Sequence, residues 1–84
     1  MRRKKLLWKV ISGSASIRFA DFAAAVEAFG FRRDRVRGSH HIFVHDDIPE
    51  LLNLQNCKGK AKPYQIRQFL ALIEQYDMSM EGDE

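Results

Sequence analysis

The chain has 84 residues, 45% apolar and 30% charged, which suits one small globular domain and excludes a large multidomain enzyme. No apolar run approaches the roughly 20 residues of a membrane-spanning helix, and the basic start lacks the apolar stretch of a signal peptide, so we expect a cytoplasmic protein without membrane association. The single cysteine, Cys57, excludes an internal disulfide and a cysteine-rich zinc site.

Positive charge is concentrated before the last few residues. Lys and Arg number 14 against 11 Asp and Glu, a formal net charge of +3. Four of the acids lie at or after Asp77, so residues 1–76 carry 14 basic residues against 7 acidic ones. This excess favours a polyanionic partner, most simply nucleic acid, although an anionic membrane surface or an acidic protein satisfies the same electrostatics.

Residues 1–16 are predicted to form an N-terminal extension with a short helical turn, followed by one domain over residues 17–77. The domain begins with apolar residues at i, i+3, i+4, i+7 and i+10, the spacing of one helical stripe. Gly30 follows the stripe directly and suits the left-handed conformation that commonly ends a helix. The stripe consists of Phe19, Phe22, Ala23, Val26 and Phe29.

Three short strands are predicted next, over residues 31–37, 40–45 and 51–55. Gly38 separates the first two, and Asp46 begins the turn before the third. Side chains alternate along a strand, so the middle strand presents its residues to two opposite faces. One face carries His41, Phe43 and His45, and the other carries His40, Ile42 and Val44.

A last helix is predicted from Pro63, a typical first helical residue, to near Tyr76, and residues 78–84 are predicted to form an acidic flexible tail. Its apolar residues Ile66, Phe69, Leu70 and Ile73 follow helical spacing. The element order predicts a two-layer α+β domain, with both helices on one face of a three-stranded antiparallel sheet. The opposite face is then open to a partner.

All three histidines of the chain lie within residues 40–45. Imidazole titrates near neutral pH and can move a proton between oxygens. RNA suits this chemistry because its 2′-OH is an internal nucleophile, so a histidine and nearby cations can cleave it without a metal or cofactor. A strand histidine is more often only a partly buried polar residue, and His41 and His45 are too far apart for a tight metal chelate.

A lysine-rich loop precedes the last helix and carries Lys58, Lys60 and Lys62. A helix N-terminus attracts phosphate through unpaired N–H groups and the helix dipole, and we expect the lysine ammonium groups to reinforce this attraction. The alternative, a solvated loop that binds no phosphate, remains open. Arginines of the first strand extend the basic surface, and strand alternation lets only part of them share a face. They are Arg32, Arg33, Arg35 and Arg37.

Three segments resemble the HicA family of toxin mRNA interferases: Phe-Gly-Phe at 29–31, Arg-Val-Arg-Gly-Ser-His-His-Ile-Phe at 35–43, and Lys-Ala-Lys-Pro-Tyr-Gln-Ile-Arg-Gln-Phe at 60–69. The resemblance implies a fold similar to a double-stranded-RNA-binding domain, ribonuclease activity against mRNA, and a HicB-type antitoxin that covers the active site. The family's glycine-x-histidine signature falls on Gly38 and His40 and implies that His40 is catalytic. His41 is the competitor, because some members place the histidine one residue later.

We therefore expect a toxin of a type II toxin–antitoxin system, acting in stress response as a metal-independent endoribonuclease and forming a hetero-oligomer with its antitoxin. His40 and His41 are the candidate general base or acid, Gly30 and Gly38 are structural, and no cofactor is expected. A non-catalytic RNA-binding module and a basic protein-interaction subunit remain open alternatives. The expected RNA-binding residues are Ser39, Arg35, Arg37, Lys58, Lys60 and Lys62.

Overall fold

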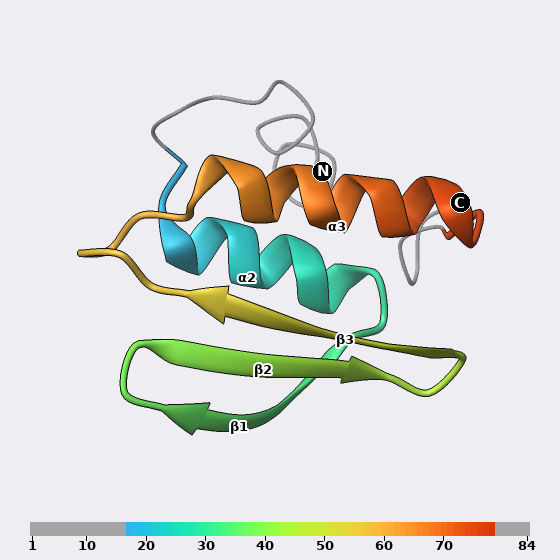
Figure 1. The fold of residues 1–84 in the computed structure, drawn as a ribbon, viewed down its shortest axis with the longest axis horizontal. Coiled ribbons are helices and arrows are strands. Elements are labelled where there is room, and N and C mark those ends of the chain that lie inside the picture. Colours follow the sequence, from blue (N-terminus) through green and yellow to red (C-terminus); the bar gives the residue numbers. More distant parts are fainter. Residues whose placement is uncertain (1–16, 79–84) are drawn as a thin grey trace.

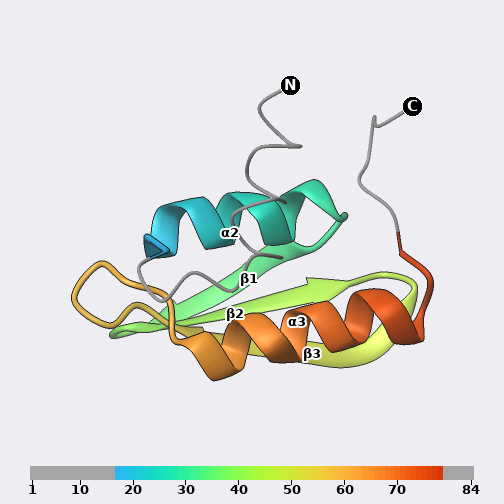
Figure 2. The same cartoon turned by 90° about the horizontal axis from the view of Figure 1, so that it is seen from above.

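The computed structural model describes residues 17–78, which form a helix, three strands and a second helix (Figure 1). The strands make an antiparallel sheet in the order β1-β2-β3, and both helices lie on one face of it (Figures 1 and 2). This confirms the predicted arrangement of a double-stranded-RNA-binding domain. The predicted extension, residues 1–16, and residues 79–84 of the predicted tail lie outside the described residues. The elements are α2 (Phe19–Ala28), β1 (Arg32–Arg37), β2 (His40–His45), β3 (Ile48–Gln55) and α3 (Pro63–Gln75).

The two helices form where the apolar stripes predict them. Helix α2 buries Phe22 and Val26 completely, and α3 begins at Pro63 as predicted. At the end of α2, Phe29 is the C-cap and Gly30 has a φ of 95°, a left-handed conformation that glycine adopts without a Cβ clash. Neither helix is long and apolar enough to cross a membrane.

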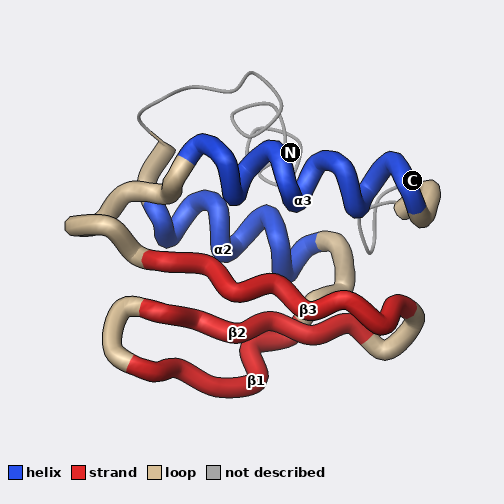
Figure 3. Tube along the Cα trace, in the orientation of Figure 1, coloured by secondary structure: helices blue, strands red, loops and turns tan. Residues whose placement is uncertain are grey.

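The strands form a meander joined by two tight turns (Figure 3). Gly38, with a φ of 58°, lies in the turn between β1 and β2. The predicted start of the third strand was wrong, because β3 begins at Ile48 rather than at Leu51. Pro49 argues locally against a strand, since it lacks an N–H donor, but β3 is an edge strand and tolerates the missing donor.

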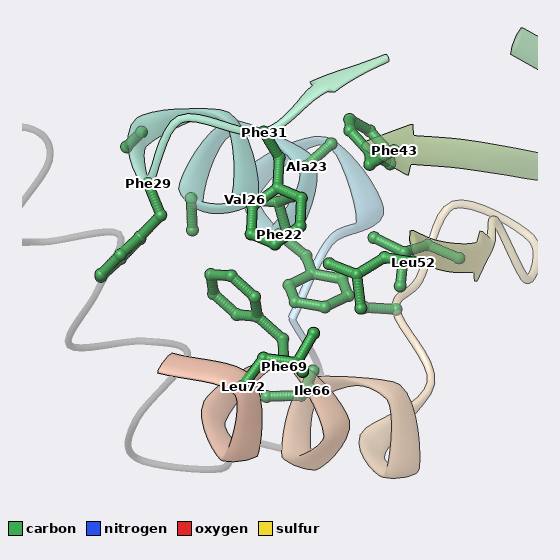
Figure 4. Close-up of a cluster of buried hydrophobic side chains, with 14 of the residues drawn as sticks. Phe22, Ala23, Val26, Phe29, Phe31, Phe43, Leu52, Ile66, Phe69 and Leu72 are labelled. Atoms are coloured by element: carbon green, nitrogen blue, oxygen red, sulfur yellow. The ribbon is translucent and has the colours of Figure 1, made fainter. Parts of the chain in front are cut away.

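Phe69 of α3 is the aromatic centre of the core (Figure 4). Its ring centroid lies 5.8 Å from that of Phe22, 5.4 Å from that of Phe29 and 6.2 Å from that of Phe31, all in edge-on geometry. Such pairs contribute about 0.5–1.5 kcal/mol each beyond the burial of their apolar surface. Because the three partners lie along α2 and at the entry to β1, Phe69 joins both helices to the sheet.

We expect Phe69→Ala to lower the free energy of unfolding by about 3–5 kcal/mol, because it removes a fully buried ring and leaves a cavity. Chemical denaturation followed by circular dichroism measures this loss. The exposed neighbour Gln68 provides the control, and Gln68→Ala should change stability by less than about 0.5 kcal/mol. Equal effects of the two substitutions would show that Phe69 does not organise the core.

Candidate active site

The three histidines of β2 have three different environments, although they are close in sequence. His41 and His45 point to the helix-covered face, together with the fully buried Phe43. His40 points to the open face and is exposed. The predicted alternation along this strand is therefore confirmed, and it separates the two adjacent candidates, His40 and His41.

His45 has a structural role. Its Nε2–H donates to the carbonyl oxygen of Phe29 at 3.2 Å, and its Nδ1 accepts the backbone N–H of Asp47 at 3.0 Å. The ring also lies edge-on to Phe31, with centroids 5.0 Å apart. Both ring nitrogens are thus occupied in fastening the turn between β2 and β3 to the end of α2.

His41 is partly buried beneath α2. Its ring centroid lies 4.7 Å from that of Phe19, and its Nδ1 is buried with no hydrogen-bond partner among the described residues. Desolvation by burial lowers the pKa of His41 below its usual 6.5, and the positive charge of Arg33 lowers it further. Both effects favour the neutral form of His41, and its ring is packed against the helix layer.

His40 lies on the open face of the central strand. It is paired across the sheet with Arg37 on β1 and with Gln55 on β3. Its Nδ1 lies 3.0 Å from Oδ1 of Asn53, also on β3. His40 is thus exposed, held by a neighbouring strand and next to a cation.

The lysine-rich loop has a defined shape. Cys57 and Lys60 exchange two backbone hydrogen bonds of 3.0 Å. The two residues between them, Lys58 and Gly59, have φ values of 54° and 84°, and consecutive positive φ values are typical of a type I′ turn. The side chain of Asn56 accepts the N–H of Gly59 at 2.7 Å. Lys58 and Lys60 are therefore presented, exposed, by an ordered hairpin.

Backbone hydrogen bonds fasten this loop to the start of the sheet and of α2. The N–H of Asn56 donates to the carbonyl oxygen of Ser39 at 2.8 Å, and the N–H of Phe19 donates to that of Gly59 at 2.8 Å. The β1–β2 turn, the loop and the first turns of both helices consequently gather at one end of the molecule (Figure 1). We call the region of residues 37–41 and 56–62 the site end.

Lys62 is the N-cap residue of α3 and is half-buried. Its ammonium group lies 5.9 Å from the ring centroid of Tyr64, which is 55% exposed. The first turn of α3 contains no acidic residue, so the positive end of the helix dipole is not neutralised there. The three predicted lysines and the start of α3 thus form one electropositive feature.

The two arginines predicted to bind RNA lie on the same face as His40. Arg37 is directly opposite His40, and Arg35 is opposite Ile42. The guanidinium of Arg35 lies 3.2 Å from the carboxylate of Asp34. Arg37 is therefore better placed to act beside His40, and a phosphate at Arg35 must compete with Asp34.

The other two arginines of β1 have different positions. Arg33 lies over the Phe43 ring, with its guanidinium carbon 5.2 Å from the centroid. Arg32 pairs with Asp46 at 3.2 Å, at the opposite end of β1 from the site end. The expectation that only part of the arginine set shares a face is therefore confirmed.

Charge is segregated along the domain. Residues 17–76 contain nine Lys and Arg against seven Asp and Glu, so five of the seven excess positive charges of residues 1–76 lie in residues 1–16. Within the domain, three lysines and Arg37 belong to the site end, whereas Asp47 and Asp77 line a cavity of about 360 Å³ at the other end. The site end is therefore electropositive, because it contains these four cations and no Asp or Glu, whereas the other five arginines of residues 17–78 lie outside it.

That cavity contains none of the predicted catalytic or RNA-binding residues, because it is formed mainly by the end of α2, the β2–β3 turn and the end of α3. The candidate site is an exposed surface on the sheet and loop. Within the described part of the chain, no three His, Cys, Asp or Glu side chains come together as a metal site requires. An open surface suits a long polymer better than a small enclosed substrate.

Two further residues shape the candidate site, and neither is among the predicted catalytic or RNA-binding residues. Asn53 contacts His40, and Gln65, only 4% exposed, donates through Nε2 to the Asn53 carbonyl at 3.0 Å. Oε1 of Gln65 also accepts the Gln55 N–H at 3.0 Å. The available signal for Gln65 was its position four residues before Phe69, on the apolar stripe.

A family model describing the HicA toxin of bacterial toxin–antitoxin systems matches residues 19–75, from the start of α2 to the end of α3. The chain belongs to the HicA toxin family. No curated protein and no solved structure matches the chain. As a HicA toxin, it is the toxin component of a toxin–antitoxin system and pairs with an antitoxin.

We expect His41 to titrate below pH 6.5 and to make the fold less stable in mild acid. In the unfolded chain His41 binds a proton near pH 6.5, whereas the environment of His41 in the folded chain opposes protonation. The stability of the fold with neutral His41 is therefore fully present above pH 6.5 and falls as the pH drops below it. NMR titration of the ring protons measures the pKa, and denaturant unfolding at several pH values measures the stability.

Two variants test the causes. His41→Phe should lose less stability on acidification than the unsubstituted HicA chain, and Arg33→Gln should move the pKa of His41 upward, towards 6.5. A His41 pKa at or above 6.5 in the unsubstituted chain would contradict the burial argument.

Proposed function

We propose that this HicA toxin is a metal-independent endoribonuclease that cleaves mRNA, with His40 as its general base. The proposal rests on one observation: His40 is the exposed member of the three histidines and lies opposite Arg37 at the electropositive site end. His45 has both ring nitrogens engaged, and His41 is packed against Phe19.

The chemistry follows from the substrate. The imidazole of His40 takes the proton of a ribose 2′-OH, and the 2′-oxygen attacks the adjacent phosphorus. The bond from phosphorus to the 5′-oxygen then breaks. One fragment ends in a 2′,3′-cyclic phosphate, and the leaving oxygen takes up a proton from water to become a 5′-hydroxyl. Because the nucleophile belongs to the RNA, this step needs no metal-bound water.

The cations of the site end have two roles in this proposal. Arg37, opposite His40, stabilises the negative charge that develops on the phosphate oxygens in the transition state. Ser39 and the loop residues Lys58, Lys60 and Lys62 hold neighbouring phosphates, together with the start of α3. The ordered loop fixes these contacts relative to His40, because Asn56 bonds the Ser39 carbonyl.

The partner of the same surface is, in this proposal, a HicB-type antitoxin that covers His40 and forms a hetero-oligomer with the toxin in the cytoplasm. The site end is basic, so the covering surface of the antitoxin should be acidic. RNA and the antitoxin then compete for one face, which accounts for inhibition without a conformational change in the toxin.

We expect His40→Ala to reduce cleavage of a long single-stranded RNA by about 10²- to 10⁴-fold, the usual contribution of a general base. The assay contains excess EDTA, and analysis of the product ends should find 2′,3′-cyclic phosphate. His41→Phe is the matched control, because it keeps a ring against Phe19, and it should retain cleavage. Circular dichroism establishes that both variants fold.

Four results would overturn parts of this assignment. Loss of cleavage in His41→Phe but not in His40→Ala would reverse the roles of the two histidines. Cleavage by the unsubstituted toxin that disappears when EDTA is added would refute metal independence. Binding without cleavage by the unsubstituted toxin would favour an RNA-binding module. Binding of an acidic protein that RNA does not displace would favour a protein-interaction subunit.

We expect Lys60→Ala to weaken RNA binding and to reduce the salt dependence of the affinity. Loss of one phosphate contact should lower the slope of log affinity against log salt by about 0.7 for single-stranded RNA. Arg32→Ala is the control, because Arg32 is paired with Asp46 away from the site end, and it should leave the slope unchanged. The same slope for Lys60→Ala as for the unsubstituted toxin would remove Lys60 from the binding surface.

A further inference from the structure

We infer that Asn53 is the positioning residue of His40 and selects the imidazole tautomer that can act as a base; this inference rests on the proposed ribonuclease function. Oδ1 of Asn53 lies 3.0 Å from Nδ1 of His40. A carbonyl oxygen only accepts hydrogen bonds, so Nδ1 carries the proton. A neutral imidazole has one N–H, and Nε2 is therefore left with a free lone pair.

The register of the sheet makes this contact possible. Asn53 is paired with Ile42, and the neighbouring residue pair on the same face is Gln55 with His40. Diagonal neighbours on one face of an antiparallel sheet are within reach of each other's longer side chains. The Asn53 amide therefore meets His40 diagonally across the open face, with the 8%-exposed Ile42 directly opposite.

A buried side chain of α3 holds the backbone of Asn53 in place. The carbonyl oxygen of Asn53 accepts Nε2–H of Gln65, and the N–H of Gln55 donates to Oε1 of the same side chain. Both hydrogen bonds are 3.0 Å long, and Gln65 is buried. One α3 amide thus fixes the β3 backbone on both sides of Leu54, so the Asn53 side chain starts from a fixed position.

This bond matters because a histidine side chain in water favours the other tautomer, with the proton on Nε2. Without Asn53, the exposed His40 ring would also be free to rotate, and ordering it during the reaction would add to the barrier. Asn53 supplies orientation without charge. Arg37 is the charged residue paired with His40, while Gln55, on the other side of the strand, is neutral.

The first test reads the tautomer directly. Nitrogen-15 NMR of the unsubstituted toxin, at a pH where His40 is neutral, should give the shifts of a protonated Nδ1 and a bare Nε2. In Asn53→Ala the shifts should move towards the tautomer with the proton on Nε2. A proton on Nε2 in the unsubstituted toxin would overturn the inference, whether or not the protein cleaves RNA.

The second test uses cleavage of single-stranded RNA in excess EDTA across a range of pH. Asn53→Ala should lower the rate at saturating RNA by about 10- to 100-fold, comparable to removing the outer partner of a metal-bound histidine, with RNA affinity unchanged. Asn53→Asp should retain activity, and the acidic limb of its pH profile should move upward by up to about one unit, because a carboxylate stabilises the imidazolium. A purely structural role would not move that limb.

Leu51→Ala is the matched control, because it truncates an exposed side chain of the same strand, and it should leave rate and pH profile unchanged. An unchanged rate in Asn53→Ala would overturn the inference while leaving the proposed function intact. The expected tautomer in a toxin that cuts no RNA would instead refute the proposed function.

Discussion

A single buried amide determines how the site is assembled. Gln65 lies on the apolar stripe of α3 and bonds the Asn53 carbonyl and the Gln55 N–H of the edge strand β3. The Gln65 amide satisfies these two backbone groups much as a further strand would. The Asn53 carbonyl and the Gln55 N–H would each carry a desolvation cost if buried without a partner. Since α3 follows the lysine-rich loop directly, the same amide fixes that loop and Asn53 relative to each other.

The helices and the core could be predicted from sequence because both depend on local periodicity. Phe22 and Phe69 stand at helical spacing within their stripes, and an apolar stripe must be buried whatever the details of the fold. The two faces of β2 could be predicted in the same way, because successive side chains of a strand point to alternate faces whatever the strand pairs with. These predictions needed no knowledge of which elements touch.

The contacts that organise the site could not be predicted in this way. The bond between Asn53 and His40 depends on the register of β2 against β3, and that register shifts between Phe43 and His45. The shift lies next to Pro49, which also concealed the true start of β3. Such features follow from pairing between strands, and a single sequence contains no local signal for them.

The core, rather than the candidate site, decides which histidine lies on the open face of the sheet. Phe43 is fully buried under the helices, so alternation places His41 with it and His40 on the opposite face. A slip of one residue in the register of β2 would exchange the two histidines and would expose Phe43, at a cost of about 1.5–3 kcal/mol in lost apolar burial. The adjacent histidines are therefore not interchangeable: the packing of Phe43 places His40 on the open face and His41 on the helix-covered face, where it is partly buried.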